Sequence, residues 1–250
     1  MVRVLSLLSL VLISFTSCQF SEDLYINEDG TGKMEFSFNG DQLMQMAGDE
    51  MAKGEKESID STLVFKDFLN QKEDSIAALS AEEQAKLKAL EPLSMKMLMN
   101  PQEKKMLFSV LTDFKDVNQL QDMMQAMKTM SQLDKPKEEN TVEVNPLDAF
   151  DTGELTQLSY SMKGNTFMRS LVITDKEQYK TVTDSLEQAT MMFAGSTYTL
   201  NYHFPRKIKS VSNEAAVIAE DGKSVSVEYE FIKYLTDPES MNLEVVLEDN

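Results

Sequence analysis

The sequence predicts an α+β fold, with an antiparallel sheet built from repeated β-hairpin-then-helix units, helices on one face of it, and a strand-rich C-terminal part. Three observations support this prediction. Stretches in which apolar and polar residues alternate, typical of half-buried strands, occur in pairs joined by turn residues. A stretch with helical spacing follows each of the first three pairs, near 24–52, 93–130 and 155–193. From residue 197 onward the chain holds only alternating stretches and turns.

The first unit begins with a hairpin. Residues 24–27 and 33–38 form its two predicted strands, and the second strand alternates apolar and polar side chains. Asp29-Gly30 lies between them and is a strong signal for a tight hairpin turn. Residues 41–52 then carry apolar side chains at helical spacing, so a helix is expected there.

The chain between the first and second units gives one clear signal. Residues 53–70 show no decisive pattern. Ser80 and Glu83 form a capping box, in which each residue satisfies a backbone N–H group of the other. A helix is therefore expected to begin at Ser80 and to end before Pro92.

Residues 93–114 allow two interpretations. Met95, Met97 and Met99 alternate with polar residues, and a second alternating run follows Asn100-Pro101. This pattern favours a hairpin that turns at Asn100-Pro101, whereas the same residues could instead cap one long helix. We prefer the hairpin, followed by a helix over 116–130.

Polar residues separate two parts of the chain. A linker is predicted over 134–153, between an N-terminal α+β part (18–133) that contains a Met-rich segment and a C-terminal α+β part (154–250). No internal repeat of residue identity accompanies the repeated pattern.

The C-terminal part opens with the third unit. Its predicted hairpin pairs 155–162 with 166–174, and a capping box of Thr174 and Glu177 is expected to start the helix behind it. The tail is then all strand, and the last strand is expected to close the sheet. The predicted strands of the tail are 197–204, 215–219, 224–231 and 242–247.

The first residues of the chain bear on location. Arg3 precedes an apolar run over 4–16, which is too short to cross a hydrocarbon core that needs about 20 residues. Its length is that of the apolar region of a secretory signal. Small residues then lead into Cys18. This run resembles the lipobox of bacterial lipoproteins, whose cysteine is lipidated and becomes the first residue after cleavage, although Phe15 stands where the family prefers leucine.

This resemblance implies a signal peptide over 1–17 and a lipid on Cys18, the single cysteine. The alternative is an ordinary signal peptide followed by a chance cysteine. The implied location is the outer membrane, at its periplasmic face or the cell surface, with the membrane as a partner through the acyl chains on Cys18. Glu22 and Asp23 resemble the acidic export signal of Bacteroidota lipoproteins; otherwise, residues 19–23 are a solvated lead-in. With a first strand at Leu24, this lead-in would be a tether of no more than about 20 Å.

A second resemblance lies in the tail. Residues 202–208, 221–225 and 242–245 look like the C-terminal part of uncharacterised Bacteroidota lipoproteins, and are more distantly similar to lipoproteins of the LppM type. The resemblance implies a non-enzymatic envelope lipoprotein. It supplies no functional residues.

Composition excludes several chemistries. The net charge is −18, and binding nucleic acid needs clustered Lys and Arg, so nucleic acid is not expected as a partner. One histidine and one cysteine cannot form a typical zinc site, and there is no phosphate-binding glycine loop. His203 falls on the polar side of its predicted strand. We expect no cofactor, no catalytic residue and no enzyme activity; a hydrolase that uses paired carboxylates is the third possibility.

Methionine is unusually frequent, with 18 residues, eleven of them between Met44 and Met130. Thioethers select copper(I), but methionine also fills cores and lines apolar grooves. We expect core packing, and keep a groove for an apolar ligand and a copper(I) site as alternatives. The copper candidates are Met95, Met97, Met99, Met123, Met124 and Met127.

Together these patterns predict a lipid-anchored envelope lipoprotein that acts as a non-catalytic binding or scaffolding module, with another envelope protein as its candidate partner. The alternative function is a carrier for an apolar ligand or for copper(I) in the Met-rich half.

Overall fold

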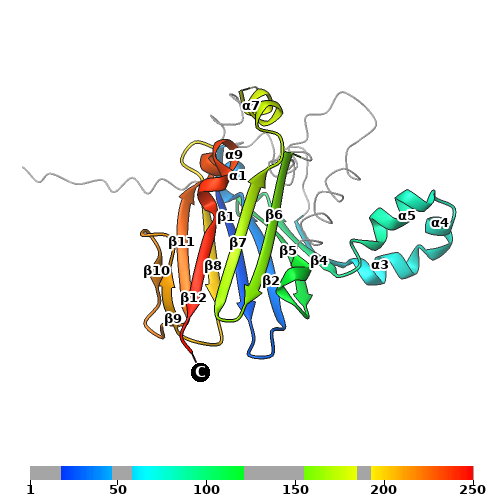
Figure 1. Ribbon diagram of the computed structural model, residues 1–250. Coiled ribbons are helices and arrows are strands. Elements are labelled where there is room, and N and C mark those ends of the chain that lie inside the picture. Colours follow the sequence, from blue (N-terminus) through cyan, green and yellow to red (C-terminus); the bar gives the residue numbers. More distant parts are fainter. Residues whose placement is uncertain (1–17, 47–57, 121–154, 185–192, 250) are drawn as a thin grey trace, which may run out of the picture.

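The computed structural model describes residues 18–46, 58–120, 155–184 and 193–249. These residues form the predicted α+β fold, in which two sheets pack face to face and helices lie at one end and at one side (Figure 1). The eight-stranded sheet has the order β10-β11-β8-β1-β2-β5-β4-β3, and the four-stranded sheet has the order β6-β7-β12-β9. The second sheet, rather than a layer of helices, covers the inner face of the first. The predicted signal peptide over 1–17 and the linker over 134–153 lie outside the described residues.

The first unit is confirmed as a hairpin and a helix, but the hairpin starts earlier than predicted. β1 (Gln19–Ile26) pairs with β2 (Gly32–Asn39) along its whole length. The turn forms as Asp29-Gly30 predicted, because the Thr31 backbone N–H donates to the Asp29 carboxylate at 3.0 Å and Gly30 takes a φ of 81°. α1 (Asp41–Met46) follows, and the rest of the predicted helix lies outside the described residues.

A helical excursion stands between the first two units. It follows β3 (Ile59–Val64) and projects from the sheets in Figure 1. Its helices are α3 (Phe65–Gln71), α4 (Glu73–Ala77) and α5 (Ala81–Lys88). The capping box of Ser80 and Glu83 is confirmed at the start of α5.

Residues 93–114 form a hairpin and not a helix, as we preferred. β4 (Leu93–Asn100) pairs with β5 (Lys105–Phe114). The turn forms because the Asn100 side-chain oxygen accepts hydrogen bonds from the backbone N–H groups of Gln102 and Glu103, at 3.1 and 3.0 Å. Of the helix predicted over 116–130, the described residues show the 3-10 turn η1 (Val117–Gln119).

The third unit is also confirmed, with a different cap. β6 (Thr156–Lys163) pairs with β7 (Thr166–Ile173), and α7 (Lys176–Asp184) follows. The predicted capping box of Thr174 and Glu177 is wrong in register. The cap acceptor is Asp175, whose carboxylate accepts from the Gln178 backbone N–H at 2.9 Å, which fits a helix that begins at Lys176.

The tail is strand-rich as predicted, but the expectation that it is all strand is wrong, because a short α-helix and a 3-10 turn follow residue 230. Two strands also pair differently from the prediction. β8 lies beside β1 and runs parallel to it, so the eight-stranded sheet is mixed and joins the two predicted parts of the chain. The last strand, β12, belongs to the second sheet, between β7 and β9. The elements of the tail are β8 (Thr197–His203), β9 (Ile208–Val211), β10 (Val217–Ile218), β11 (Ser224–Glu230), α9 (Phe231–Thr236), η4 (Pro238–Met241) and β12 (Leu243–Leu247).

One apolar core lies between the sheets. Alternate residues of β1, β2 and β8 point into it, as the period of two dictates. The four-stranded sheet contributes Phe167, whose ring lies 5.3 Å from that of Tyr202 and 5.4 Å from that of Phe204. The core places β1 at the centre of the molecule, with Cys18 directly at its start.

Candidate functional site

Cys18 is part of the folded domain and not of a tether. Its carbonyl oxygen accepts from the Thr197 backbone N–H at 3.1 Å, which extends the ladder between β1 and β8 by one residue. Its side chain lies on the same face of β1 as Phe20, points into the core and is 3% exposed. Burial raises the pKa of the Cys18 thiol, and hydrogen bonds to the Ser196 side chain and the Leu43 backbone reduce this increase.

The predicted tether over residues 19–23 is therefore wrong. These residues belong to β1, and no free segment separates Cys18 from the sheet. Glu22 is 1% exposed and Asp23 is half-buried, with a carboxylate that accepts from Asn201 at 3.1 Å. In the folded domain neither the acidic export signal nor the solvated lead-in describes them, because Glu22 faces the core.

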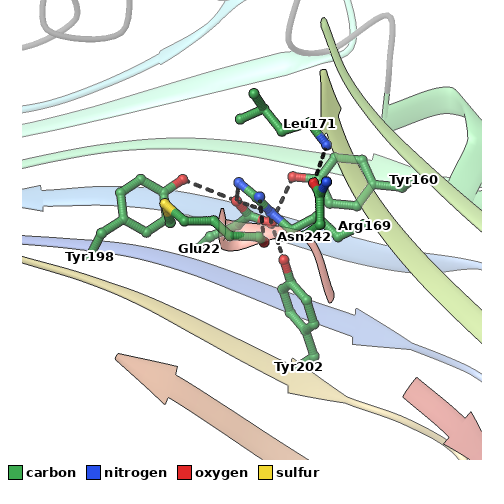
Figure 2. A network of polar contacts seen from close by, with 8 residues as sticks. Glu22, Tyr160, Arg169, Leu171, Tyr198, Tyr202 and Asn242 are labelled. Atoms are coloured by element: carbon green, nitrogen blue, oxygen red, sulfur yellow. Dashed lines mark hydrogen bonds and ion pairs between the residues drawn. The ribbon is translucent and has the colours of Figure 1, made fainter. Parts of the chain in front are cut away.

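Glu22 is the centre of a buried polar cluster between the sheets (Figure 2). The Tyr160 hydroxyl on β6 donates to its carboxylate at 2.6 Å, and the Tyr198 hydroxyl on β8 donates at 3.0 Å. Tyr202, also on β8, donates a third and very short hydrogen bond. All three rings are fully buried. Because every neighbour donates, the arrangement suits an ionised carboxylate.

Arg169 on β7 supplies the positive charge of this cluster. Its Nη2 lies 3.2 Å from Glu22 Oε2, and its Nη1 donates to the Met241 carbonyl oxygen at 3.1 Å. Burial is the largest single effect and disfavours the guanidinium charge, but the Glu22 carboxylate and the three tyrosines together outweigh it, so the pKa of Arg169 is raised. The ion pair thus joins the central strand of one sheet to the other sheet and to η4.

The surroundings fix the protons of the cluster. Burial, followed by the charge of Glu22, raises the pKa of Tyr160, Tyr198 and Tyr202 well above the ordinary value for tyrosine. The three phenols therefore remain protonated donors at physiological pH. With its charges paired and its donors directed at one carboxylate, the cluster can hold the two sheets in one register.

Sequence analysis placed Glu22 in an export signal or a solvated lead-in, and it did not single out Arg169. A signal for Glu22 was present, because Phe20, Glu22 and Leu24 share one face if the first strand is extended back to Gln19. The charged pair at positions 22 and 169 carried no signal of its own, since the two residues are distant in sequence and the chain is rich in carboxylates.

A hollow of about 300 Å³ lies on the outer face of the eight-stranded sheet. Leu111 and Ser94 line it together with two carboxylates and two lysines. In the part of the chain that the structure describes, neither Lys33 nor Lys96 forms an ion pair; Lys33 instead lies over the Tyr25 ring at 4.6 Å. The lining mixes charged side chains with apolar ones. It comprises Tyr25, Lys33, Met34, Glu35, Thr62, Pro92, Ser94, Lys96, Leu111, Thr112 and Asp113.

The methionines of β4 behave mainly as core residues. Met95 and Met97 are partly buried and pack against the core, and Met99 is half-buried near the strand end. The copper candidates Met123, Met124 and Met127 lie outside the described residues. Copper(I) binding is thus an untested alternative.

The remaining expectations concern histidine, metals and the membrane. His203 lies on the outer face, stacks on Tyr25 with ring centroids 4.1 Å apart, and its Nδ1 lies 2.9 Å from the Ser224 hydroxyl. Among the described residues, no group of three or more His, Cys, Asp or Glu side chains is placed to hold a metal ion. No helix within the described ranges is both long and apolar enough to cross a membrane.

Comparisons with known proteins give little. No protein-family model matches the chain, and no characterised protein matches its sequence. Among solved structures, the NMR structure of the folded domain of Mycobacterium tuberculosis LppM aligns with 94% of this chain and 91% of that chain, at a TM-score of 0.39 and 7% identity. A similarity this low supports no inference about function, and the resemblance to Bacteroidota lipoproteins stays a prediction.

Proposed function

We propose that the protein is a lipid-anchored envelope lipoprotein, modified on Cys18, that acts as a non-catalytic binding or scaffolding module. One observation supports this above the others: the cysteine of the lipobox-like run comes directly before β1, and its backbone is hydrogen-bonded to Thr197. A lipid there is attached to the central strand of the sheet, and this strand is held by the Glu22 cluster.

The proposed modification follows the chemistry that the lipobox resemblance implies. The Cys18 sulfur forms a carbon–sulfur bond to the diacylglyceryl group of a membrane phospholipid, while the thiol proton and the phosphate head group leave. Hydrolysis of the peptide bond before Cys18 then frees its amino group. Two acyl chains hold a protein on a membrane where one chain does not, since each buried methylene contributes about 0.8 kcal/mol.

The non-catalytic part of the proposal is supported by the Glu22 cluster. It is the most buried group of titratable side chains in the described residues. Its members form their hydrogen bonds with one another rather than facing a substrate site. The alternative of an apolar or copper(I) carrier has weaker support, because Met95 and Met97 pack against the core and the hollow has a charged lining.

The test is a comparison of the natural chain with Cys18→Ala in its own type of envelope. The natural chain is expected in the membrane fraction with a lipid-derived mass on Cys18, and Cys18→Ala as a soluble protein or an uncleaved precursor. Ser17→Ala is the matched control, because it changes the neighbouring residue and keeps the sulfur. If Cys18→Ala is processed and retained like the natural chain, the proposal is wrong.

A further inference from the structure

We propose that the end of the sandwich around Cys18 lies against the lipid head groups, and that the lipid leaves the domain between α1 and the segment Phe193–Ser196. This inference rests on the proposed function, since it needs a lipid on Cys18. It adds the orientation of the domain on the membrane, the surface that contacts the head groups and the helix that must move to let the lipid pass.

The first argument is the absence of a linker. An extended residue spans at most about 3.6 Å, and β1 starts one residue after Cys18. The backbone of Cys18 is itself fixed by the hydrogen bond from Thr197. A lipid on this residue therefore holds the adjoining end of the sandwich at the level of the head groups, and the domain has no flexible arm on which to turn away.

The second argument is the direction of the side chain. Cys18 points toward the inner face, and its thiol is hydrogen-bonded to the Ser196 side chain and to the Leu43 backbone. A thioether-linked glyceryl group is too large for this buried position. Since the two hydrogen-bond partners of the sulfur belong to α1 and to the segment before β8, the lipid is expected to pass between these two elements.

The third argument is that α1 is weakly held. Its six residues are too few for an independently stable helix. Asp41 fixes its start by accepting from the Met106 backbone N–H at 2.8 Å. At the next position, Gln42 Oε1 is the one buried side-chain polar atom in the described residues that lacks a hydrogen-bond partner. A buried polar atom without a partner lowers the stability of the fold. Movement of α1 would expose this oxygen to water or to lipid head groups.

The fourth argument is the apolar core next to Cys18. Phe20, which follows Cys18 on the same face of β1, packs against three further phenylalanines, with ring centroids 4.0 to 5.8 Å away. These partners are Phe38, Phe193 and Phe231. All four rings are buried, so the attachment point adjoins the apolar core, and a movement of α1 would uncover apolar area suited to the first methylenes of acyl chains.

The opposite end of the molecule provides the contrast. β1 carries the chain eight residues away from Cys18, to the turn that contains Glu28. At about 3.3 Å per residue this turn lies roughly 26 Å from the anchor along the strand. The two ends are thus far enough apart for a short-range membrane probe to distinguish them.

The chain offers a clean labelling design. Cys18 is the single cysteine and is blocked when lipidated, so an introduced cysteine is the only free thiol. Gln45→Cys places a fluorophore on the exposed side of α1, and Glu28→Cys, the matched control, places it at the exposed distal turn. Full-length lipidated protein is inserted into vesicles of phosphatidylethanolamine and phosphatidylglycerol that contain a head-group nitroxide quencher.

Several-fold stronger quenching at Gln45→Cys than at Glu28→Cys is the expected result. Equal quenching, or stronger quenching at Glu28→Cys, overturns the orientation while leaving the proposed function intact, provided that mass spectrometry finds the lipid on Cys18. An unmodified Cys18 overturns both.

A second readout tests the route of the lipid. A spin label at Gln45→Cys is compared in lipidated protein and in the unlipidated Cys18→Ser variant, both in detergent micelles. Greater label mobility in the lipidated protein is expected if α1 gives way. Unchanged mobility, with Gln45→Cys still quenched in vesicles, shows that the lipid leaves by another route and overturns that part of the inference.

Discussion

The carboxylate of Glu22 and the guanidinium of Arg169 form an ion pair across the two sheets, with Nη2 and Oε2 3.2 Å apart and the side chains 1% and 0% exposed. Three tyrosines complete the cluster around it (Figure 2). Because a shift of β1 by one residue would turn Glu22 to the outer face, the pair specifies the register of β1.

Arg169→Met is expected to destabilise the domain by about 3–5 kcal/mol, because it leaves the buried Glu22 carboxylate without its cation. Urea unfolding of the unlipidated domain measures this loss of unfolding free energy. The control is Lys180→Met, which breaks the exposed pair with Asp184 and is expected to cost about 0.5 kcal/mol or less. The double variant Glu22→Gln/Arg169→Met should recover part of the loss. A single variant as stable as the natural domain would contradict the role of the pair.

Tyr202→Phe is expected to cost about 1–3 kcal/mol, because it removes a buried donor to an ionised acceptor and keeps the ring. Tyr25→Phe makes the same chemical change on the outer face, where the ring is 38% exposed, and should change the unfolding free energy little. Similar effects of the two substitutions would show that the cluster adds no more than a surface hydroxyl does.

Stability should fall at alkaline pH. Six of the seven tyrosines have a raised pKa, mainly through burial; that of Tyr179 is raised to about 12. The unfolded chain loses these protons near pH 10 and the folded domain keeps them, so the folded state binds more protons above that pH. The stability contributed by burying the neutral phenols is thus present at neutral pH and is lost as the pH rises above about 10.

Unfolding in urea at about pH 8 and about pH 11, with phenolate absorbance recorded in parallel, checks this prediction. Ionisation of the buried tyrosines should coincide with loss of the folded circular dichroism. If six tyrosines ionise near pH 10 while the domain stays folded, the buried environment assigned to them is wrong.

Gly32→Ala is expected to be strongly destabilising, at about 1–3 kcal/mol or more, because the core next to it is closed. A Cβ atom there would lie 2.1 Å from the Tyr25 carbonyl oxygen and 2.3 Å from the Phe114 ring. The control is Gly164→Asn, at a turn with a φ of 61° and open space around it, where asparagine is tolerated. Thermal unfolding of the two variants should therefore differ clearly, and equal melting temperatures would contradict the packing of Phe114.

Much of the fold could be predicted from local patterns. Alternation placed Met34, Phe36, Phe38, Tyr198 and Tyr202 on inward faces, and turn residues located the hairpins. The parallel pairing of β1 with β8 could not be predicted, since it joins residues more than 170 positions apart. The second sheet could not be predicted either, since β12 pairs there with β7, which lies more than 70 positions earlier in the chain.

The candidate site was predicted only in part. Cys18 was singled out because the apolar run before it has the length of the apolar region of a secretory signal. Glu22 was missed because an acidic residue near a lipobox-like cysteine favours an exposed segment, and the residues that make its burial tolerable, such as Arg169 and Tyr160, lie far along the chain. The start of β1 was placed five residues late for the same reason.

The central claim is that Cys18 carries the lipid and begins the mature chain. Mass spectrometry of the N-terminal peptide from the natural envelope tests it most directly, because the first lysine after Cys18 is Lys33 and trypsin releases residues 18–33 as one piece. The account predicts that this peptide begins at Cys18 and carries the mass of a diacylglyceryl group. A mature chain that begins elsewhere, or a peptide with an unmodified Cys18 thiol, would contradict it.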